Sequence, residues 1–231
     1  EQFGTLMEGM PIPHAPEHPI YLRSPLDTGT ASGEWFTLKP DVEMAIDQRL
    51  DDAGSLTFQT APLVADHDYL GRPVLALTLR CDAETANLCA RLIDIHPDGT
   101  ATRVSFGVLN LAHRNSNAEP EPLSKGERTR VTLTLDACGY RFRKGHRIRL
   151  SLSTAYWPMV LPPPEDPGLT IDLASIGLGL PKLGAHGVID LKQPDNPDPL
   201  PKYIEHAPAS TKRRGRCDRL GGEKPCFFYT S

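Results

Sequence analysis

The chain has 231 residues, of which 39% are hydrophobic and 23% charged, a balance that excludes an intrinsically disordered chain. Its formal net charge of −4 argues against nucleic acid and anionic membranes as partners, because both require a clustered positive field. No apolar run reaches the roughly 18 residues that a bilayer-spanning helix needs, so no membrane segment is expected.

Residues 1–54 are predicted to form an extended N-terminal lead-in. The chain contains 23 prolines, and proline disfavours helices because it removes a hydrogen-bond donor and clashes with the preceding turn. Prolines hold the runs 10–13 and 14–16 extended. Residues 20–22 are expected to form a short strand, and a single apolar helical turn is indicated around residues 42–46.

From residue 55 onward, apolar and polar side chains alternate, as in strands that bury one face. Residues 88–95 are instead apolar on both sides, which is typical of a central strand. Turns are expected at Pro97-Asp98-Gly99 and at Lys144-Gly145, where glycine accepts a positive φ. The predicted strands centre on residues 56–58, 75–79, 88–95, 104–108, 131–135, 148–152 and 169–173.

These short strands have no convincing crossover helix between them, so they predict an all-β antiparallel sandwich of two sheets and not a parallel α/β fold. We expect the sandwich to span residues 55–176. Alternation stops after Leu173, and prolines and basic residues follow. Residues 177–231 are therefore predicted to form a loop-rich C-terminal tail.

The cysteines bear on the cellular compartment. Cys81, Cys89, Cys138, Cys217 and Cys226 are odd in number and form no C-x-x-C pair. Free thiols in a reducing cytoplasm are therefore expected, with a Cys81–Cys89 disulfide as the alternative. The first four residues lack the basic and apolar regions of a secretory signal, and the absence of a starting Met suggests an internal fragment.

No catalytic residue is identified in the sequence. A serine nucleophile elbow requires G-x-S-x-G, and the nearest segment, residues 29–33 (GTASG), has Ser32 displaced by one position. The segment is read as a flexible loop. Asp66-His67-Asp68 contains no nucleophile and is expected in a surface loop.

No metal, cofactor or nucleic-acid site is predicted either. His14 and His18 have helical ligand spacing, but Pro16 lies between them, so an exposed loop is favoured. Asp94 and His96 share one strand face, where a structural hydrogen bond at the strand end is expected. The basic run 212–216 lacks interleaved aromatic residues and is read as a solvated tail.

Three aromatic residues are candidates for a binding surface. Trp35 follows a glycine-rich loop, and Tyr156 and Trp157 follow the strand that ends near residue 154. Such side chains fill a core or a domain interface, where Tyr and Trp are enriched, or stack on sugar rings.

Four segments in the same order and spacing resemble the C-terminal domain of the X-Pro dipeptidyl-peptidase and cocaine-esterase-like serine hydrolases. The resemblance covers roughly residues 20–175, and Ser24-Pro25 and Gly33-Glu34-Trp35 are similar to the lead-in of a bacterial subgroup. The segments are DQRLDDAGSLTF at 47–58, TAPL at 60–63 leading to LGRP at 70–73, ARLIDIHPDG at 90–99, and FRKGHRIRLSLS at 142–153 followed by YWP at 156–158.

The resemblance implies a jelly-roll β-sandwich of the galactose-binding-like type, an accessory domain beside a separate α/β-hydrolase domain. In such proteins that other domain carries the Ser-Asp-His triad, so no catalytic residue is transferred to this chain. The α/β-hydrolase domain is the implied partner, in the same or another polypeptide, and contact between copies of the chain is also implied. The alternative is a free-standing jelly-roll module that binds a carbohydrate or a protein.

Overall fold

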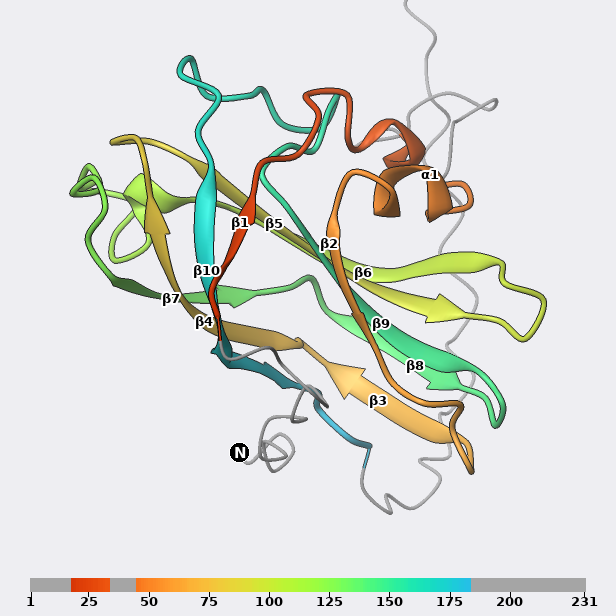
Figure 1. The fold of residues 1–231 in the computed structure, drawn as a ribbon. Coiled ribbons are helices and arrows are strands. Elements are labelled where there is room, and N and C mark those ends of the chain that lie inside the picture. The colour runs from red at the N-terminus through yellow and green to blue at the C-terminus, as the bar shows by residue number, and fades with distance from the viewer. Residues whose placement is uncertain (1–17, 34–44, 184–231) are drawn as a thin grey trace, which may run out of the picture. The chain divides into compact units, whose positions relative to one another are not determined.

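The computed structural model describes residues 18–33 and 45–183, and all of them belong to the first of two units into which the chain divides, residues 1–186 (Figure 1). Within this part, two four-stranded antiparallel sheets form a sandwich. The first sheet has the order β1-β10-β4-β7, with strands Ile20–Leu22, Leu169–Gly179, Val74–Cys81 and Thr129–Thr134. The second has the order β2-β9-β5-β6, with strands Leu56–Gln59, Arg147–Ser153, Asn87–Ile95 and Ala101–Asn110.

Smaller elements complete the described part. A pair of antiparallel strands, β3 (His67–Gly71) and β8 (Cys138–Phe142), forms a separate two-stranded sheet. Three short helices lie in the connections: η1 (Thr30–Ser32), α1 (Arg49–Asp52) and η2 (Leu111–His113). No helix in the described ranges is both long and apolar enough to cross a bilayer.

The predicted all-β sandwich is confirmed, and the alternating strands build its core. β4 buries every second residue, and Leu75, Leu77 and Leu79 belong to one apolar cluster with Leu88 and Leu92 of β5. That cluster takes residues from both sheets, as expected where two inner faces meet. The two predicted turns are also present, because Gly99 and Gly145 have φ of 88° and 85°.

β5 is buried along its whole length, as the apolar run 88–95 predicted. Leu88, Ala90 and Leu92 face the core. Cys89 and Arg91 alternate with them and are also buried. The outer face of this strand is therefore covered by other parts of the chain, which explains why the sequence shows no polar alternation there.

β10 continues to Gly179, beyond the boundary that the loss of alternation placed at residue 176. Its pairing with β4 shifts register between Asp172 and Gly177, and this irregularity interrupts the period of two. Within it, Ser175 Oγ accepts from the amide of Thr78 at 2.7 Å and donates to the carbonyl of Asp172 at 2.6 Å. The Ser175 side chain thus takes the place of a backbone hydrogen bond between β10 and β4, at the point where the alternation of apolar and polar residues stops.

The expectation of a surface loop at residues 66–68 is wrong for two of the three residues. His67 and Asp68 are the first residues of β3 and pair with Phe142 and Arg141 of β8. The Asp68 carboxylate accepts from the Arg141 guanidinium at 2.6 Å and 2.8 Å. A strand that begins with His and Asp lacks the apolar alternation used to recognise strands.

Leu150→Asp tests the inward face of β9. Leu150 is buried in the shared core, so an aspartate there would place an unpaired charge among apolar side chains. We expect a loss of several kcal/mol in the free energy of unfolding, measured by urea denaturation. Thr132→Asp, at an exposed position of β7, is the control and should cost about 1 kcal/mol or less. A Leu150→Asp protein that unfolds at the wild-type urea concentration would contradict the assigned face.

Candidate functional site

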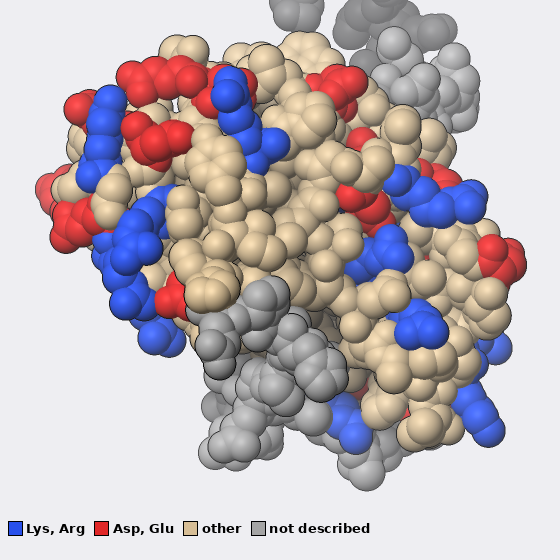
Figure 2. Space-filling model, in the orientation of Figure 1, with Lys and Arg blue, Asp and Glu red and all other residues tan. Residues whose placement is uncertain are grey.

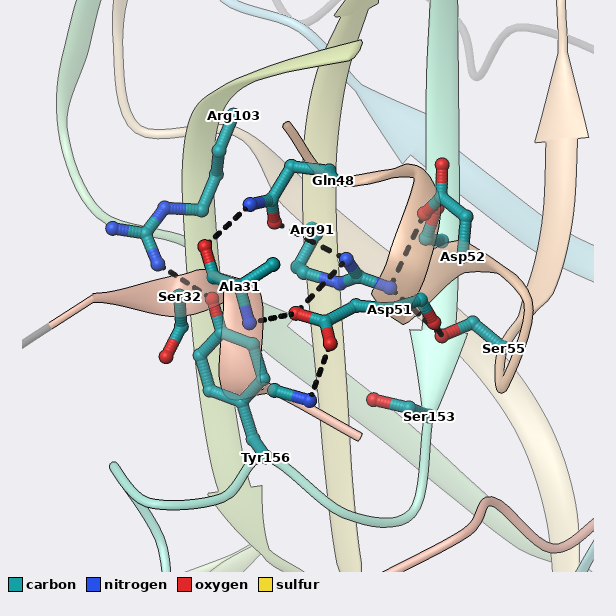
Figure 3. A network of polar contacts seen from close by, with 12 residues as sticks. Ala31, Ser32, Gln48, Asp51, Asp52, Ser55, Arg91, Arg103, Ser153 and Tyr156 are labelled. Carbon is teal, nitrogen blue, oxygen red and sulfur yellow. Dashed lines mark hydrogen bonds and ion pairs between the residues drawn. The ribbon is translucent and has the colours of Figure 1, made fainter. Parts of the chain in front are cut away.

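A buried arginine lies at the centre of the polar network in Figure 3. Arg91 projects from the outer face of β5 and is fully buried. Its Nη1 donates to Gln48 Oε1 at 3.1 Å, and its Nη2 donates to Ser55 Oγ at 2.8 Å. The same guanidinium forms ion pairs with Asp52 at 3.2 Å and with Asp51 at 3.8 Å. All four partners come from the segment between residues 48 and 55, so one side chain attaches this segment to the sheet.

Asp51 extends the network to the loop around η1. Its carboxylate accepts from the amide of Gly29 at 2.9 Å and from the amide of Ala31 at 3.1 Å. Gln48 Nε2 donates to the carbonyls of Ala31 and Ile46, both at 2.8 Å. Two parts of the lead-in, far from β5 in sequence, are thus bonded to each other and to Arg91.

The network contains two cations and two anions. Arg149 Nη1 lies 2.6 Å from Asp52 Oδ2, and Ser151 Oγ donates to Asp52 Oδ1 at 2.7 Å. Arg91 and Arg149 therefore balance Asp51 and Asp52. Such balance is needed because an unpaired charge removed from water costs several kcal/mol.

Cys89 lies on the same face of β5 as Arg91, two residues away. Burial raises the pKa of its thiol to about 12, and the positive charge of Arg91 and a hydrogen bond with Ser153 oppose this rise only in part. A thiol is a nucleophile only as the thiolate. Cys89 therefore remains neutral and unreactive at neutral pH.

The aromatic candidates have different environments. Tyr156 is buried, its hydroxyl accepts from Arg103 Nη1 at 2.6 Å, and its ring lies 5.5 Å from that of Phe106. Trp157 is 41% exposed, and its amide donates to the carbonyl of Thr28. Trp35 lies outside the described residues, as do His14 and the basic run 212–216.

The described part, residues 18–33 and 45–183, contains no hydroxyl–imidazole–carboxylate relay. Ser32 is buried in η1, and its Oγ donates to the carbonyl of Gly33. Thr102, His96 and Asp94 lie near one another, but His96 uses the same Nε2 for Thr102 at 3.1 Å and for Asp94 at 3.7 Å. A relay needs the hydroxyl and the carboxylate on opposite ring nitrogens. This geometry does not support acyl transfer.

Asp94 bonds to residues other than the predicted one. His96 is 3.7 Å away, too far for a hydrogen bond. His146 Nδ1 instead lies 2.9 Å from Asp94 Oδ2, and the Tyr140 hydroxyl donates to the same oxygen at 2.9 Å. Burial, followed by the bond to Asp94, raises the pKa of Tyr140 to about 12. The expected Asp94–His96 hydrogen bond is therefore wrong, because the Asp94 carboxylate is bonded instead by His146 and Tyr140. The pairing of β5 with β9 brings His146 beside it, and sequence spacing does not reveal that pairing.

Sequence reasoning missed the Arg91 network. The signal was Arg91, which with Asp94 is one of two charged residues in the run 88–95, since a charge in a strand buried on both faces must be paired. Asp51 and Asp52 carry no comparable signal. They lie in a polar segment that forms a single helical turn, α1.

Comparison with known families decides the relationship. Residues 7–197 match the model of the X-Pro dipeptidyl-peptidase C-terminal non-catalytic domain. The chain belongs to this family. The family assignment does not favour a free-standing binding module.

Curated relatives are much longer than the domain. The chain is 26% identical over 203 residues to a Streptomyces avermitilis protein named as a Xaa-Pro dipeptidyl-peptidase, covering 69% of this chain and 30% of that protein. It is 26% identical over 140 residues to the cocaine esterase of a Rhodococcus species, covering 60% of the chain and 24% of the esterase. The matched part is thus less than a third of either relative.

Solved structures support the same fold. An α-amino acid ester hydrolase matches with a TM-score of 0.61 at 18% identity, covering 72% of this chain and 33% of that chain. An aminopeptidase from a Thaumarchaeota archaeon of marine sediment matches with a TM-score of 0.57 at 18% identity, covering 75% and 34%. At these identities the likeness concerns the fold of the non-catalytic domain.

Arg91→Met tests the central role of the buried guanidinium. The substitution keeps most of the side-chain volume but leaves Asp51 with only amide partners for its charge. We expect a loss of about 3–5 kcal/mol in the free energy of unfolding, measured by urea denaturation. Arg130→Met, at an exposed position of β7, is the matched control and should change stability by less than about 1 kcal/mol. Equal stabilities of the two variants would show that the network does not hold the lead-in.

Proposed function

We propose that the chain is the accessory C-terminal domain of a serine hydrolase whose peptide or ester hydrolysis is performed by an α/β-hydrolase domain outside residues 1–231. The family match carries this proposal. The curated relatives support it, because the chain matches only 20% to 30% of their lengths and leaves room in each for a separate catalytic domain. A partner in the same polypeptide follows most simply.

The proposed docking surface consists of Leu26, Trp157 and Leu161. These side chains are 48%, 41% and 73% exposed. They belong to two loops joined by the hydrogen bond from the Trp157 amide to the Thr28 carbonyl. An aromatic side chain among aliphatic ones is a common centre of an interface. Trp35 stays a candidate interface residue on the sequence alone, and Tyr156 supports the surface as the buried residue directly before Trp157.

The distribution of charge favours the same side of the domain. Figure 2 shows an area without Lys, Arg, Asp or Glu beside β1 and between β1 and β2, with charged groups at its margins, including those next to β2. Interfaces have such a charge-poor centre and a polar rim. The catalytic domain is the proposed occupant, and a second copy of the chain is the competing one.

Further parts of the proposal concern fold type, organisation and location. We assign the sandwich to the jelly-roll, galactose-binding-like type, with residues 1–54 as lead-in. The main sandwich begins at residue 55 and extends past the expected boundary at 176 to the end of β10 at Gly179, and the residues after it form the tail. Cys81, Cys89 and Cys138 are free thiols in the described part. Their reduced state fits a cytoplasmic location.

The isolated chain is predicted to be inactive on Xaa-Pro-p-nitroanilides and on short p-nitrophenyl esters, and a fluorophosphonate probe should not label it. A chimera tests the accessory role. The C-terminal 30% of the Streptomyces avermitilis relative, the share that this chain matches, is replaced by the chain. Activity and thermal stability of the chimera should exceed those of the same relative truncated before its C-terminal domain. Turnover by the isolated chain, or a chimera no better than the truncation, would refute the proposal.

Trp157→Ser in the chimera locates the docking surface. Loss of a central aromatic anchor should shorten the half-life of activity at elevated temperature by about tenfold or more, since such residues contribute 2 kcal/mol or more to interfaces. Val64→Ser, at an apolar residue that is 85% exposed and outside this surface, is the control and should have no effect. Size-exclusion chromatography of the isolated chain tests the competing occupant, and a dimer abolished by Trp157→Ser would assign the surface to a second copy.

A further inference from the structure

The β5–β6 hairpin and the turn that precedes β9 bring two imidazoles and one carboxylate together at one end of the second sheet. Asp94 and His96 lie at the end of β5 and the start of its turn to β6, and His146 lies at the start of β9. One ligand atom from each of the three side chains lies within 4.8 Å of the others. The two imidazole rings are 4.6 Å apart between centroids. Neither the Arg91 network nor the proposed docking surface uses these groups.

The separations suit a single metal ion. His146 Nδ1 is 2.9 Å and His96 Nε2 is 3.7 Å from Asp94 Oδ2. Zinc lies about 2.0–2.2 Å from nitrogen and oxygen ligands, so ligand atoms around it are separated by roughly 3.0–3.5 Å. Adjustments of a few tenths of an ångström would bring each of these two nitrogens to the separation from Asp94 Oδ2 that a shared ion requires, and all three ligand atoms already lie within 4.8 Å of one another.

A neighbouring hydroxyl orients the carboxylate ligand. The Tyr140 hydroxyl donates to Asp94 and fixes the direction of its carboxylate. A hydrogen-bonded partner of this kind orients a ligand in metal sites. Thr102 Oγ1 lies 3.1 Å from His96 Nε2, the nitrogen that faces Asp94, so binding of an ion at this nitrogen replaces the Thr102 contact. The burial also suits ion entry, because Asp94 is 1% exposed whereas the His146 and His96 side chains are 13% and 34% exposed.

We propose that Asp94, His96 and His146 bind one divalent transition-metal ion of the zinc class. Two imidazoles and one carboxylate favour Zn²⁺, Co²⁺, Ni²⁺ or Cu²⁺ over Mg²⁺ and Ca²⁺, which prefer oxygen ligands. Binding replaces the His146–Asp94 hydrogen bond, so His146 carries its proton on Nε2 when Nδ1 binds the ion. The ion links the β5–β6 turn to the start of β9, with its remaining positions open to water.

Calorimetric titration of ZnCl₂ into the tag-free, metal-stripped and reduced chain tests the site. One ion should bind per chain with micromolar affinity, and MgCl₂ should give no binding heat. His96→Ala, which alters a partly exposed side chain, should weaken Zn²⁺ binding by about 100-fold, since loss of even an outer partner costs roughly 10–100-fold. His113→Ala, which removes an imidazole from η2 outside the cluster, should bind like the wild type. Thermal unfolding without metal checks that both variants fold.

Two further readouts distinguish this site from any other. Zinc at about 100 times its dissociation constant should raise the melting temperature of the wild type by roughly 5–10 °C and that of His96→Ala by much less. The absorption spectrum of the Co²⁺ complex should lack the thiolate charge-transfer band that cysteine ligands produce. Absence of saturable 1:1 binding, equal affinity in the wild type and His96→Ala, or a thiolate band would each overturn the proposal.

Discussion

The arrangement of the lead-in on the second sheet depends on one buried charge, that of Arg91. Arg91 projects from a strand whose two faces are both covered, so its guanidinium cannot reach water and must be neutralised inside the protein. Its partners lie in the segment from Gln48 to Ser55. Asp51 of this segment also accepts a hydrogen bond from the amide of Gly29, so the loop at Gly29 is held in place as well. The lead-in therefore covers the second sheet because the charge on β5 requires partners there.

The Arg91 network also positions the proposed docking surface. A Cβ atom on Gly29 would lie 2.6 Å from the backbone of Trp157, and Gly29 has φ of 115°, so the two loops meet where only glycine fits. Asp51 accepts from the Gly29 amide on the other side of this contact. The buried ion pairs and the exposed Trp157 thus belong to one connected structure, in which the interior of the domain sets the shape of its surface.

The sequence predicted the elements whose signal is local. The alternation of apolar and polar residues along β4 and β9, and the apolar residues on both faces of β5, predicted the sandwich. Which face of a strand is buried follows from the order of residues within that strand. β3 and β8 were missed, since one begins with His67-Asp68 and the other contains Gly139. The partners of Arg91 were also beyond prediction, because Gln48 and Ser55 meet it only after an irregular segment folds over the sheet. The same holds for Asp94 and His146, which meet through strand register.

Hydrogen exchange at the amides of Gly29 and Ala31, followed by NMR, tests most directly whether the Arg91 network fixes the lead-in. Both amides donate to the buried Asp51 carboxylate although they lie in a loop. The account predicts protection comparable to that of the β5 ladder amides, because their exposure requires the network to open. Exchange of these two amides as fast as that of an unprotected loop would contradict it.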